Sequence, residues 1–263
     1  MKCIKNILVP FNLLPPAIWG LEYALDFAAR DPEIVLHLFC VGKKENKKEI
    51  KTKIEVSIDN LVKEHPAFRG EIKIHVKNGN LVERIIKAQQ KLDADIIVMG
   101  TAGSKQGKED HSNTADLVLK ADCPVIVIPG PYEEFIISKI ALILGPGQIE
   151  DASNLEVLLD FARRFNAKVH VLTIYNKEED VKDTPGEEYN EQMLKYYLDK
   201  FYITHAYKES QDLEVGIFDY VDKKEINVLA ILPRNHSKKS KPSEGKLTKL
   251  LTLKTRIPLL TID

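Results

Sequence analysis

Short hydrophobic runs alternate along the chain with amphipathic stretches. In the first half the runs predict five strands, which are Ile7–Val9, Ile34–Val41, Glu71–Val76, Ile96–Met99 and Val125–Ile128. Between them, apolar residues recur at steps of three and four, which is typical of a helix with one buried face. The predicted helices are Ala17–Arg30, Ile50–Glu64, Asn80–Leu92 and Asn113–Ala121.

This order of elements predicts the fold class. Strands that alternate with helices pair in parallel through right-handed crossovers. The predicted strands are apolar throughout, as expected when helices cover both faces of a sheet. We therefore expect an α/β protein in which each half is a five-stranded, doubly wound unit of the flavodoxin-like or Rossmann-like kind.

The second half of the chain repeats the first. Leu21–Val41 and Leu155–Tyr175 align without a gap, and nine of 21 positions are identical. Ile96–Met99 resembles Val228–Ile231 at nearly the same offset, and a second such pair is Pro124–Ile128 with Pro258–Ile262. A period of about half the chain indicates two whole domains of one fold. We predict domains at residues 1–132 and 133–263, joined by a linker at 130–134 and related by an approximate twofold axis.

Some features of the second half differ from the first. Leu213–Phe218 runs directly into Asp219–Glu225, which predicts a shortened third crossover with about two turns of helix. Glu178–Glu188 is polar and acidic, and we expect it to form a loop. Five tyrosines are assigned to packing within an inserted helical region: Tyr189, Tyr196, Tyr197, Tyr202 and Tyr207.

Composition narrows the class of protein. The 263 residues carry a formal net charge of −1, with 44% hydrophobic and 29% charged residues, as in ordinary globular proteins. Such a balance argues against partners that are nucleic acids or anionic membranes. No signal peptide or long apolar segment is evident, and Cys3, Cys40 and Cys123 form no CxxC pair. We expect a cytoplasmic protein in which Cys40 and Cys123 are buried.

The loop after the fourth predicted strand is the candidate binding site, because ligands of open α/β sheets bind beyond the carboxyl ends of the strands. It begins at Met99–Gly103, and Ser112–Thr114 then opens a helix. Its two glycines would let the backbone approach an anion, although a strand-to-helix turn also needs glycine for structural reasons. Ser112 is a favourable N-cap, and the following amides favour a phosphate. Two lysines between these segments add positive charge, Lys105 and Lys108.

In combination these segments resemble the universal stress protein family. The resemblance rests on the opening ILVP strand, the LEYAL helix, the IIVMGT-x-G loop and the closing CPVIVIP strand. It spans almost the whole chain as a tandem of two such domains. It implies a non-enzymatic module for stress-responsive binding or signalling, with a protein as one kind of partner. It also implies that the two domains pair through their last strands, Val125–Ile128 and Leu259–Ile262.

Many members of that family bind ATP through a Gly-x2-Gly-x9-Gly-Ser/Thr loop, an aspartate after the first strand and a backbone position on the second. Gly100 and Gly103 match the first two glycines, but Asn113 stands where the third is expected. In an alternative alignment of Ser112–Thr114, His111 takes that place. Asn12 replaces the aspartate. The resemblance thus implies a weakened ATP site, with no tightly bound cofactor, at Pro10, Asn12, Val41, Met99, Gly100, Gly103, Ser112, Asn113 and Thr114.

The second domain lacks the corresponding motif. Leu232 corresponds to Gly100 and places a branched side chain where phosphate would lie, whereas Pro233 removes a backbone N–H group. Asn235 and Leu247 replace Gly103 and Asn113. Gly145-Pro146-Gly147 follows the first strand but lacks an accompanying Gly-x2-Gly loop. We expect no nucleotide in this domain.

No catalytic or metal-binding group is assigned. His37 and His170 occupy nearly equivalent places, one residue out of register in the gapless alignment, and we favour hydrogen-bonded structural roles over a metal site. One alternative function is an ATP-binding sensor with slow hydrolysis in the first domain. A second is an adenine-nucleotide enzyme such as an adenylating ligase, which is disfavoured by the incomplete phosphate motif and the lack of an acid–base pair.

Overall fold

The chain divides into two compact units in the computed structural model, which describes residues 3–42, 47–102, 113–131, 134–145, 149, 153–175, 185–233 and 246–262. The first domain is built mainly of Cys3–Phe135. The second is built mainly of Ile136–Leu251 and Ile257–Asp263.

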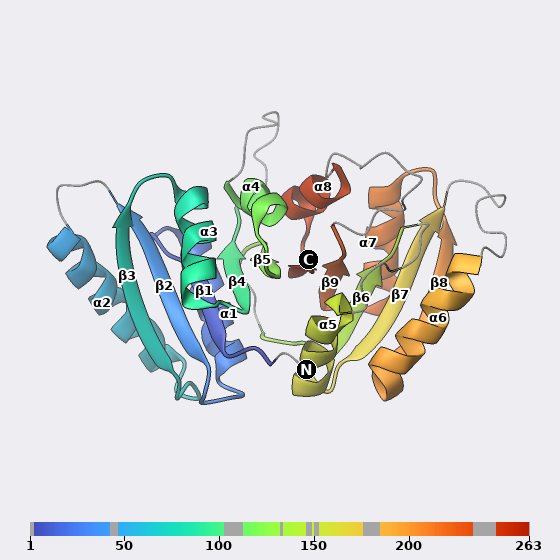
Figure 1. The fold of residues 1–263 in the computed structure, drawn as a ribbon, viewed down its shortest axis with the longest axis horizontal. Helices are drawn as coiled ribbons and strands as arrows, with labels where there is room; N and C mark the ends of the chain where they lie inside the picture. The colour runs from blue at the N-terminus through green and yellow to red at the C-terminus, as the bar shows by residue number, and fades with distance from the viewer. Residues whose placement is uncertain are drawn as a thin grey trace. The chain divides into compact units, whose positions relative to one another are not determined.

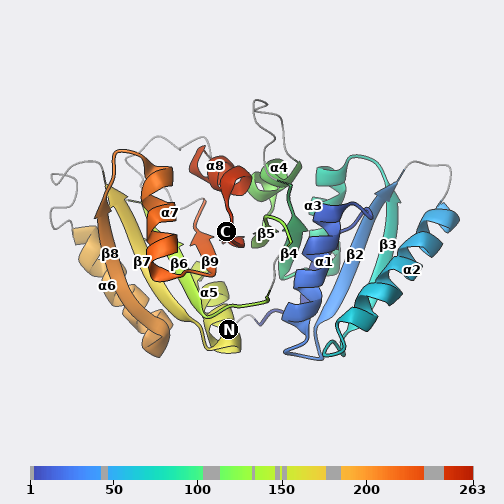
Figure 2. The same ribbon diagram turned by 180° about the vertical axis from the view of Figure 1, so that it is seen from behind.

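The first domain is a parallel sheet between two helical layers. Its strands lie in the order β3-β2-β1-β4-β5, and every pair for which a register is known is parallel. Helices α1 and α2 cover one face, and α3 and α4 cover the other (Figures 1 and 2). The strands are β1 (Asn6–Pro10), β2 (Val35–Gly42), β3 (Glu71–Asn78), β4 (Ile96–Gly100) and β5 (Val125–Ile128). The helices are α1 (Pro15–Ala28), α2 (Lys47–Glu64), α3 (Leu81–Leu92) and α4 (Asn113–Lys120).

The second domain repeats this topology, with strand order β8-β7-β6-β9-β10. Helices α5 and α6 cover one face of its sheet, and α7 and α8 the other (Figures 1 and 2). The predicted fold class, two tandem five-stranded parallel α/β domains, is confirmed. The strands are β6 (Lys139–Ile143), β7 (Lys168–Tyr175), β8 (Tyr202–Glu209), β9 (Val228–Ile231) and β10 (Leu259–Thr261). The helices are α5 (Asn154–Phe165), α6 (Pro185–Leu198), α7 (Leu213–Lys224) and α8 (Lys246–Lys254), with a 3-10 turn at Asp199–Phe201.

Strand registers correct the gapless alignment of the two halves. Leu8 pairs with His37 in the first domain, and Ala141, its counterpart, pairs with His170 in the second. The two histidines are therefore equivalent rather than one residue apart. The turn between the first helix and the second strand is one residue shorter in the second domain. The alignment consequently fails within the strand, and Val35 and Val169 are not equivalent.

The predicted shortening of the third crossover in the second domain is wrong. The apolar residues of 213–218 belong to α7, which has 12 residues, as does α3. Asp212 caps α7 by accepting a hydrogen bond from the backbone N–H of Val215 at 3.1 Å. Asn80 caps α3 in the same way, accepting from Glu83 at 3.2 Å. The two crossovers therefore have helices of the same length that begin with the same kind of side-chain cap.

The prediction that the five tyrosines pack within one helical region is wrong. Tyr189, Tyr196 and Tyr197 lie on α6, whereas Tyr202 and Tyr207 lie on strand β8. Tyr196 is 81% exposed, so packing within the domain does not explain it. Residues 185–188 of the predicted loop 178–188 belong to α6, and the rest of that loop lies outside the described residues.

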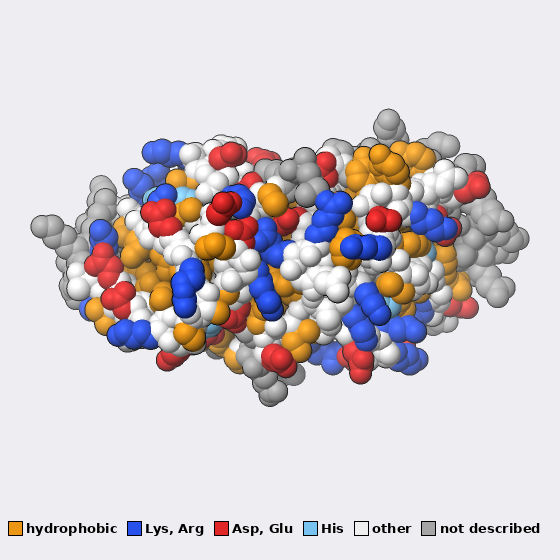
Figure 3. Space-filling model, turned by 90° about the horizontal axis from the view of Figure 1, so that it is seen from below, with side chains coloured by type: hydrophobic (Ala, Val, Ile, Leu, Met, Phe, Trp, Pro, Cys, Tyr) orange, Lys and Arg blue, Asp and Glu red, His pale blue; other side chains and the backbone are white. Residues whose placement is uncertain are grey.

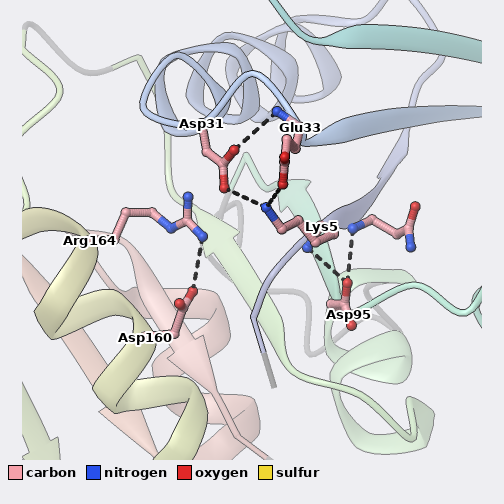
Figure 4. A network of polar contacts seen from close by, with 7 residues as sticks. Lys5, Asp31, Glu33, Asp95, Asp160 and Arg164 are labelled. Carbon is pink, nitrogen blue, oxygen red and sulfur yellow. Dashed lines mark hydrogen bonds and ion pairs between the residues drawn. The ribbon is translucent and has the colours of Figure 1, made fainter. Parts of the chain in front are cut away.

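A side-chain clamp joins the first and fourth strands in both domains. Asp95, directly before β4, accepts hydrogen bonds through Oδ2 from the backbone N–H groups of Lys5 and Asn6, each at 2.9 Å (Figure 4). Asn227 occupies the equivalent position before β9. Its Oδ1 accepts from the backbone N–H groups of Ser138 at 3.1 Å and Lys139 at 2.9 Å. Both domains therefore have this clamp. The acceptor is a carboxylate oxygen in the first domain and an amide oxygen in the second.

Burial agrees with the predicted roles of two cysteines. Cys40 and Cys123 are buried, and none of the three cysteines is in a disulfide. Burial raises the pKa of Cys40 to about 12, which keeps it a neutral thiol at physiological pH. Within the described helices, none is both long and apolar enough to cross a membrane.

Candidate functional site

The switch point of the first domain lies between β1 and β4, where the order of the strands reverses. Five predicted site residues lie at this carboxyl edge or next to it. Pro10 is the last residue of β1 and pairs with Phe39 of β2. The others are Asn12 after β1, Val41 near the end of β2, and Met99 and Gly100 at the end of β4.

The turn after β1 is held by Asn12. Its side-chain Oδ1 accepts a hydrogen bond from the backbone N–H of Leu14 at 3.2 Å, and its side chain is exposed. Between them Leu13 adopts a φ of 62°, in the left-handed region. This conformation costs a leucine about 1–2 kcal/mol, and such strain is common at functional sites. Asn12 thus has a structural role in the turn besides the nucleotide contact predicted for it.

Helix α1 begins beside this turn with two prolines, Pro15 and Pro16. Proline carries no N–H group, so the first turn of the helix lacks two of its usual donors. The preceding N–H, that of Leu14, is engaged by Asn12. Anion binding at a helix N-terminus depends on these N–H groups. The start of α1 therefore offers an anion few donors.

Gly100 is explained by the packing of α1 on β4. A Cβ atom at Gly100 would lie 1.7 Å from the carbonyl oxygen of Pro16, which is far inside contact distance. A Cβ at Gly20, within α1, would lie 2.8 Å from the backbone nitrogen of Gly100. The two glycines thus allow helix and strand to touch backbone to backbone. Sequence reasoning missed Gly20, although a glycine inside a helical pattern signals close approach.

The end of β4 leads toward α4. Thr101 is buried, and its N–H donates to the carbonyl of Ile128 at 2.8 Å. Asn113 begins α4 and is exposed, whereas Thr114 is buried. The predicted site residues Gly103 and Ser112 lie outside the described residues, as do Lys105, Lys108 and His111. Their proposed contact with phosphate stays a prediction.

At the carboxyl edge of its sheet the second domain has different residues at the positions equivalent to Gly100 and Asn12. Ile7 pairs with Ile96 in the first domain, and Ile140 pairs with Val228 in the second. These registers make Leu232 the counterpart of Gly100. They also make Gly145 the counterpart of Asn12. The Leu232 side chain is buried, and Pro233, which follows it, has no N–H to donate. Asn235 lies outside the described residues. Both described replacements are unfavourable for a phosphate loop.

The equivalent histidines are hydrogen-bonded, as predicted. His37 Nδ1 lies 3.1 Å from His75 Nε2, and His37 Nε2 lies 3.3 Å from the Oδ1 of Asn6. His170 Nδ1 lies 3.2 Å from the hydroxyl of Tyr220. In the described part of the chain no three metal-ligating side chains come together. Sequence reasoning missed His75, which reaches His37 only through the pairing of β2 with β3.

Four histidines make stability depend on pH. Burial lowers the pKa values of His37, His75, His170 and His205, and His75 and Lys73 add smaller repulsion at His37. Because these pKa values are below the unfolded value of about 6.5, the unfolded chain binds more protons as pH falls. The stabilisation that comes from keeping these histidines neutral is therefore complete above the unfolded pKa of about 6.5. It is lost as the pH falls through the lower pKa values of the folded state. We therefore expect the urea concentration at the midpoint of unfolding to fall when the pH is lowered from about 7.5 to about 5.5.

A double variant tests the source of this dependence. His37→Gln with His75→Gln removes two of the protonation sites, so the midpoint should fall less steeply with pH than in the unmodified chain. An unchanged slope would show that the pair does not contribute.

The first domain is similar in sequence to a known protein family. Residues 4–129 match the sequence profile of the Universal stress protein family. The first domain belongs to the universal stress protein family. A comparison with curated proteins gave no match.

Solved structures extend the similarity in fold to both domains. A universal stress protein from Archaeoglobus fulgidus DSM 4304 has a TM-score of 0.70 at 12% identity, covering 97% of this chain and 95% of its own. A functionally unknown protein from Pseudomonas aeruginosa PAO1 has a TM-score of 0.63 at 16% identity, covering 98% and 92%. The cytoplasmic domain of a prokaryotic cation chloride cotransporter has a TM-score of 0.56 at 12% identity, covering 98% and 95%. The chain thus carries two universal-stress-protein-like parts in tandem.

Proposed function

We propose that this universal stress protein is a non-enzymatic, cytoplasmic stress-response module for binding or signalling, which holds no nucleotide tightly. One observation carries the proposal: the turn after β1 and the start of α1 lack the groups that would hold a nucleotide. Asn12 has an amide in place of a carboxylate, and its oxygen is engaged by Leu14 at 3.2 Å. Pro15 and Pro16 remove two N–H groups next to it.

Three described segments at this edge carry no charged side chain, which supports a non-enzymatic role. Among the described residues at this edge, 10–14, 41–42 and 99–102, none is ionisable. Phosphoryl transfer depends on positioned charge that stabilises the transferred group, and general acid–base catalysis needs a titratable side chain within reach. Neither requirement is met by these three segments.

The runner-up function is an ATP-binding sensor with weak hydrolysis in the first domain. Its supporting observation is the pair of buried hydroxyl groups on Thr101 and Thr114, which flank the undescribed part of the loop after β4. Hydroxyl groups next to a helix start are suitable ligands for phosphate or its counter-ion.

Calorimetric titration of ATP into the full chain separates the two functions. We expect the unmodified protein to bind with a Kd of about 1 mM or weaker, and native mass spectrometry to find no retained nucleotide. Asn12→Asp with Asn113→Gly should improve affinity about 10- to 100-fold, because a charge-assisted hydrogen bond and a permissive backbone are restored.

Gly145→Asp is the matched control, since it adds the same charge at the equivalent position of the second domain. It should leave ATP affinity unchanged. Micromolar affinity or measurable hydrolysis by the unmodified chain would favour the sensor and contradict our proposal.

A further inference from the structure

Strand β3 forms one edge of the first domain's sheet. It pairs with β2 along all eight of its residues, and no strand of the described chain pairs with its other side. Side chains of a strand alternate between the two faces of a sheet, so Lys73, His75 and Lys77 share one face. The edge therefore presents a row of unpaired backbone groups beside basic side chains.

Helix α3 lies next to this face of β3. Burial lowers the pKa of His75, and nearby positive charges lower it further, those of Lys77, Lys73 and Lys91. Because Lys91 belongs to α3, helix and strand bring their lysines together around one imidazole. Lysine and arginine side chains gather beside a histidine over the first domain in the space-filling view (Figure 3).

The outer side of α3 is basic as well. Arg84, Lys87 and Lys91 recur at steps of three and four, the spacing of one helix face, and all three are exposed. Arg84 reaches the end of β3, because a Cβ atom at Gly79 would lie 2.8 Å from its Nε. The basic surface thus extends from the strand onto the helix.

This surface carries more positive than negative charge. We call it the basic edge, and it consists of Lys73, Lys77, Arg84, Lys87 and Lys91. Two acidic residues lie close to it. Glu71 pairs with Lys73 at 3.1 Å, and Glu83 lies one helical turn before Lys87. Within the part of the chain that the structure describes, the other four basic side chains form no ion pair.

The second domain has a counter-ion at the equivalent place. Strand registers make Lys208 the counterpart of Lys77, and the helix caps make Asp219 the counterpart of Lys87. Asp219 pairs with Lys208 and, at 3.1 Å, with Lys223. A carboxylate thus bridges two lysines in the second domain. In the first domain a third lysine stands in its place.

We propose that the basic edge binds an extended acidic segment of a partner protein. The segment adds to the sheet beside β3, where backbone N–H and C=O groups are unpaired. Its carboxylates supply the negative charge that Asp219 supplies in the second domain. The other face of β3 carries the half-buried side chains of Ile72, Ile74 and Val76, which favour apolar neighbours. The partner segment therefore alternates acidic and apolar residues.

Protection of the sheet edge does not explain the whole surface. Lysine on an edge strand prevents pairing with unrelated strands. The basic residues of α3 lie outside the strand and are not needed for that purpose. The edge strand of the second domain, β8, instead exposes Ile203 and Tyr207. The basic edge thus selects a strand by the sign of its charge, excluding basic segments and accepting acidic ones.

Fluorescence anisotropy of a labelled peptide mixed with the full chain tests the proposal. The probe has eight residues, the length of β3, with glutamate and valine in alternation. It should bind with a Kd of about 10–100 µM at low ionic strength and more weakly as salt is added. A peptide of the same composition, with its glutamates and valines in two blocks, should bind at least about tenfold more weakly, because its charges do not share one face. Equal binding of the two peptides would contradict the added strand.

Lys87→Asp gives the first domain the carboxylate that the second domain has. It should neutralise Lys77 and Lys91 and weaken binding of the alternating peptide at least about tenfold. The urea midpoint of unfolding should be no lower than that of the unmodified chain, because the new ion pairs replace repulsion between lysines. Lys63→Asp is the matched control. It changes the net charge equally on α2, which covers the opposite face of the sheet, and should leave the Kd within about twofold.

Three results would overturn the proposal. The first is a lack of binding to the unmodified chain, or binding that Lys87→Asp leaves unchanged. The second is an equal loss in Lys63→Asp, which would assign binding to net charge alone. The third concerns a single-stranded RNA of the same charge, which cannot pair with the backbone of β3 and should bind more weakly than the alternating peptide. Tighter binding of the RNA would identify a nucleic-acid surface instead.

Discussion

Gly100→Ala is expected to destabilise the first domain by about 3 kcal/mol or more, beyond the usual cost of overpacking a core. The added methyl carbon would lie 1.7 Å from the carbonyl oxygen of Pro16. That oxygen belongs to the backbone of α1 and cannot move by a side-chain rotation. Relief of the collision therefore requires α1 to move away from β4. The quantity to measure is the free energy of unfolding in urea.

Gly145→Ala is the matched control for this substitution. A Cβ atom at Gly145 would meet nothing within 4 Å, and its φ lies outside the left-handed region. We expect its effect to remain within about 0.5 kcal/mol of zero. Equal effects of the two substitutions would contradict the assignment of Gly100 to helix packing. The tight contact would then not govern stability.

Asp95→Ala should lower the free energy of unfolding by about 2–3 kcal/mol. Two backbone N–H groups, those of Lys5 and Asn6, lose a carboxylate acceptor at 2.9 Å. Hydrogen bonds to charged groups contribute about 1.5–3 kcal/mol, and donors left without a partner add a desolvation penalty. Water can reach part of this strand end, which limits the loss.

Asp95→Asn should cost much less, within about 1 kcal/mol, because it keeps an oxygen in place. Asn227 already performs this function in the second domain, where its amide oxygen accepts from Ser138 and Lys139. Asn227→Ala should therefore destabilise the second domain in the same way. If Asp95→Asn proved as damaging as Asp95→Ala, charge rather than acceptor geometry would be the basis of the clamp.

The pattern of residues was sufficient for the elements of the first domain. The predicted helix at 80–92 begins one residue later in the structure, at Leu81, with Asn80 as its cap. The periodicity of apolar residues predicts these elements because the local geometry of a helix or strand fixes which positions along the chain share one face. The prediction failed at 213–225, where Leu213, Val215 and Ile217 stand at alternate positions, a spacing that is compatible with a strand as well as a helix. The cap at Asp212 was the signal that was overlooked.

Register could not be predicted in the same way. The alignment of the two halves placed His37 one residue from His170, and strand pairing makes them equivalent. A single residue absent from a turn is invisible in a gapless comparison, but it shifts every later position. The prediction for the tyrosines was wrong for a related reason. Their spacing in the sequence does not show that Tyr196 belongs to a helix and Tyr207 to an edge strand.

By itself the sequence determined that the chain has two α/β domains of one kind, and which end of the first sheet carries the candidate site. These properties depend on repeated local patterns and on the order of the strands. Only the tertiary structure decided why residue 100 is a glycine, because the direction of its missing side chain depends on where α1 packs. It also decided that Asp95 and Asn227 perform one task, since hydrogen bonds between residues about ninety positions apart exist only once the sheet has formed.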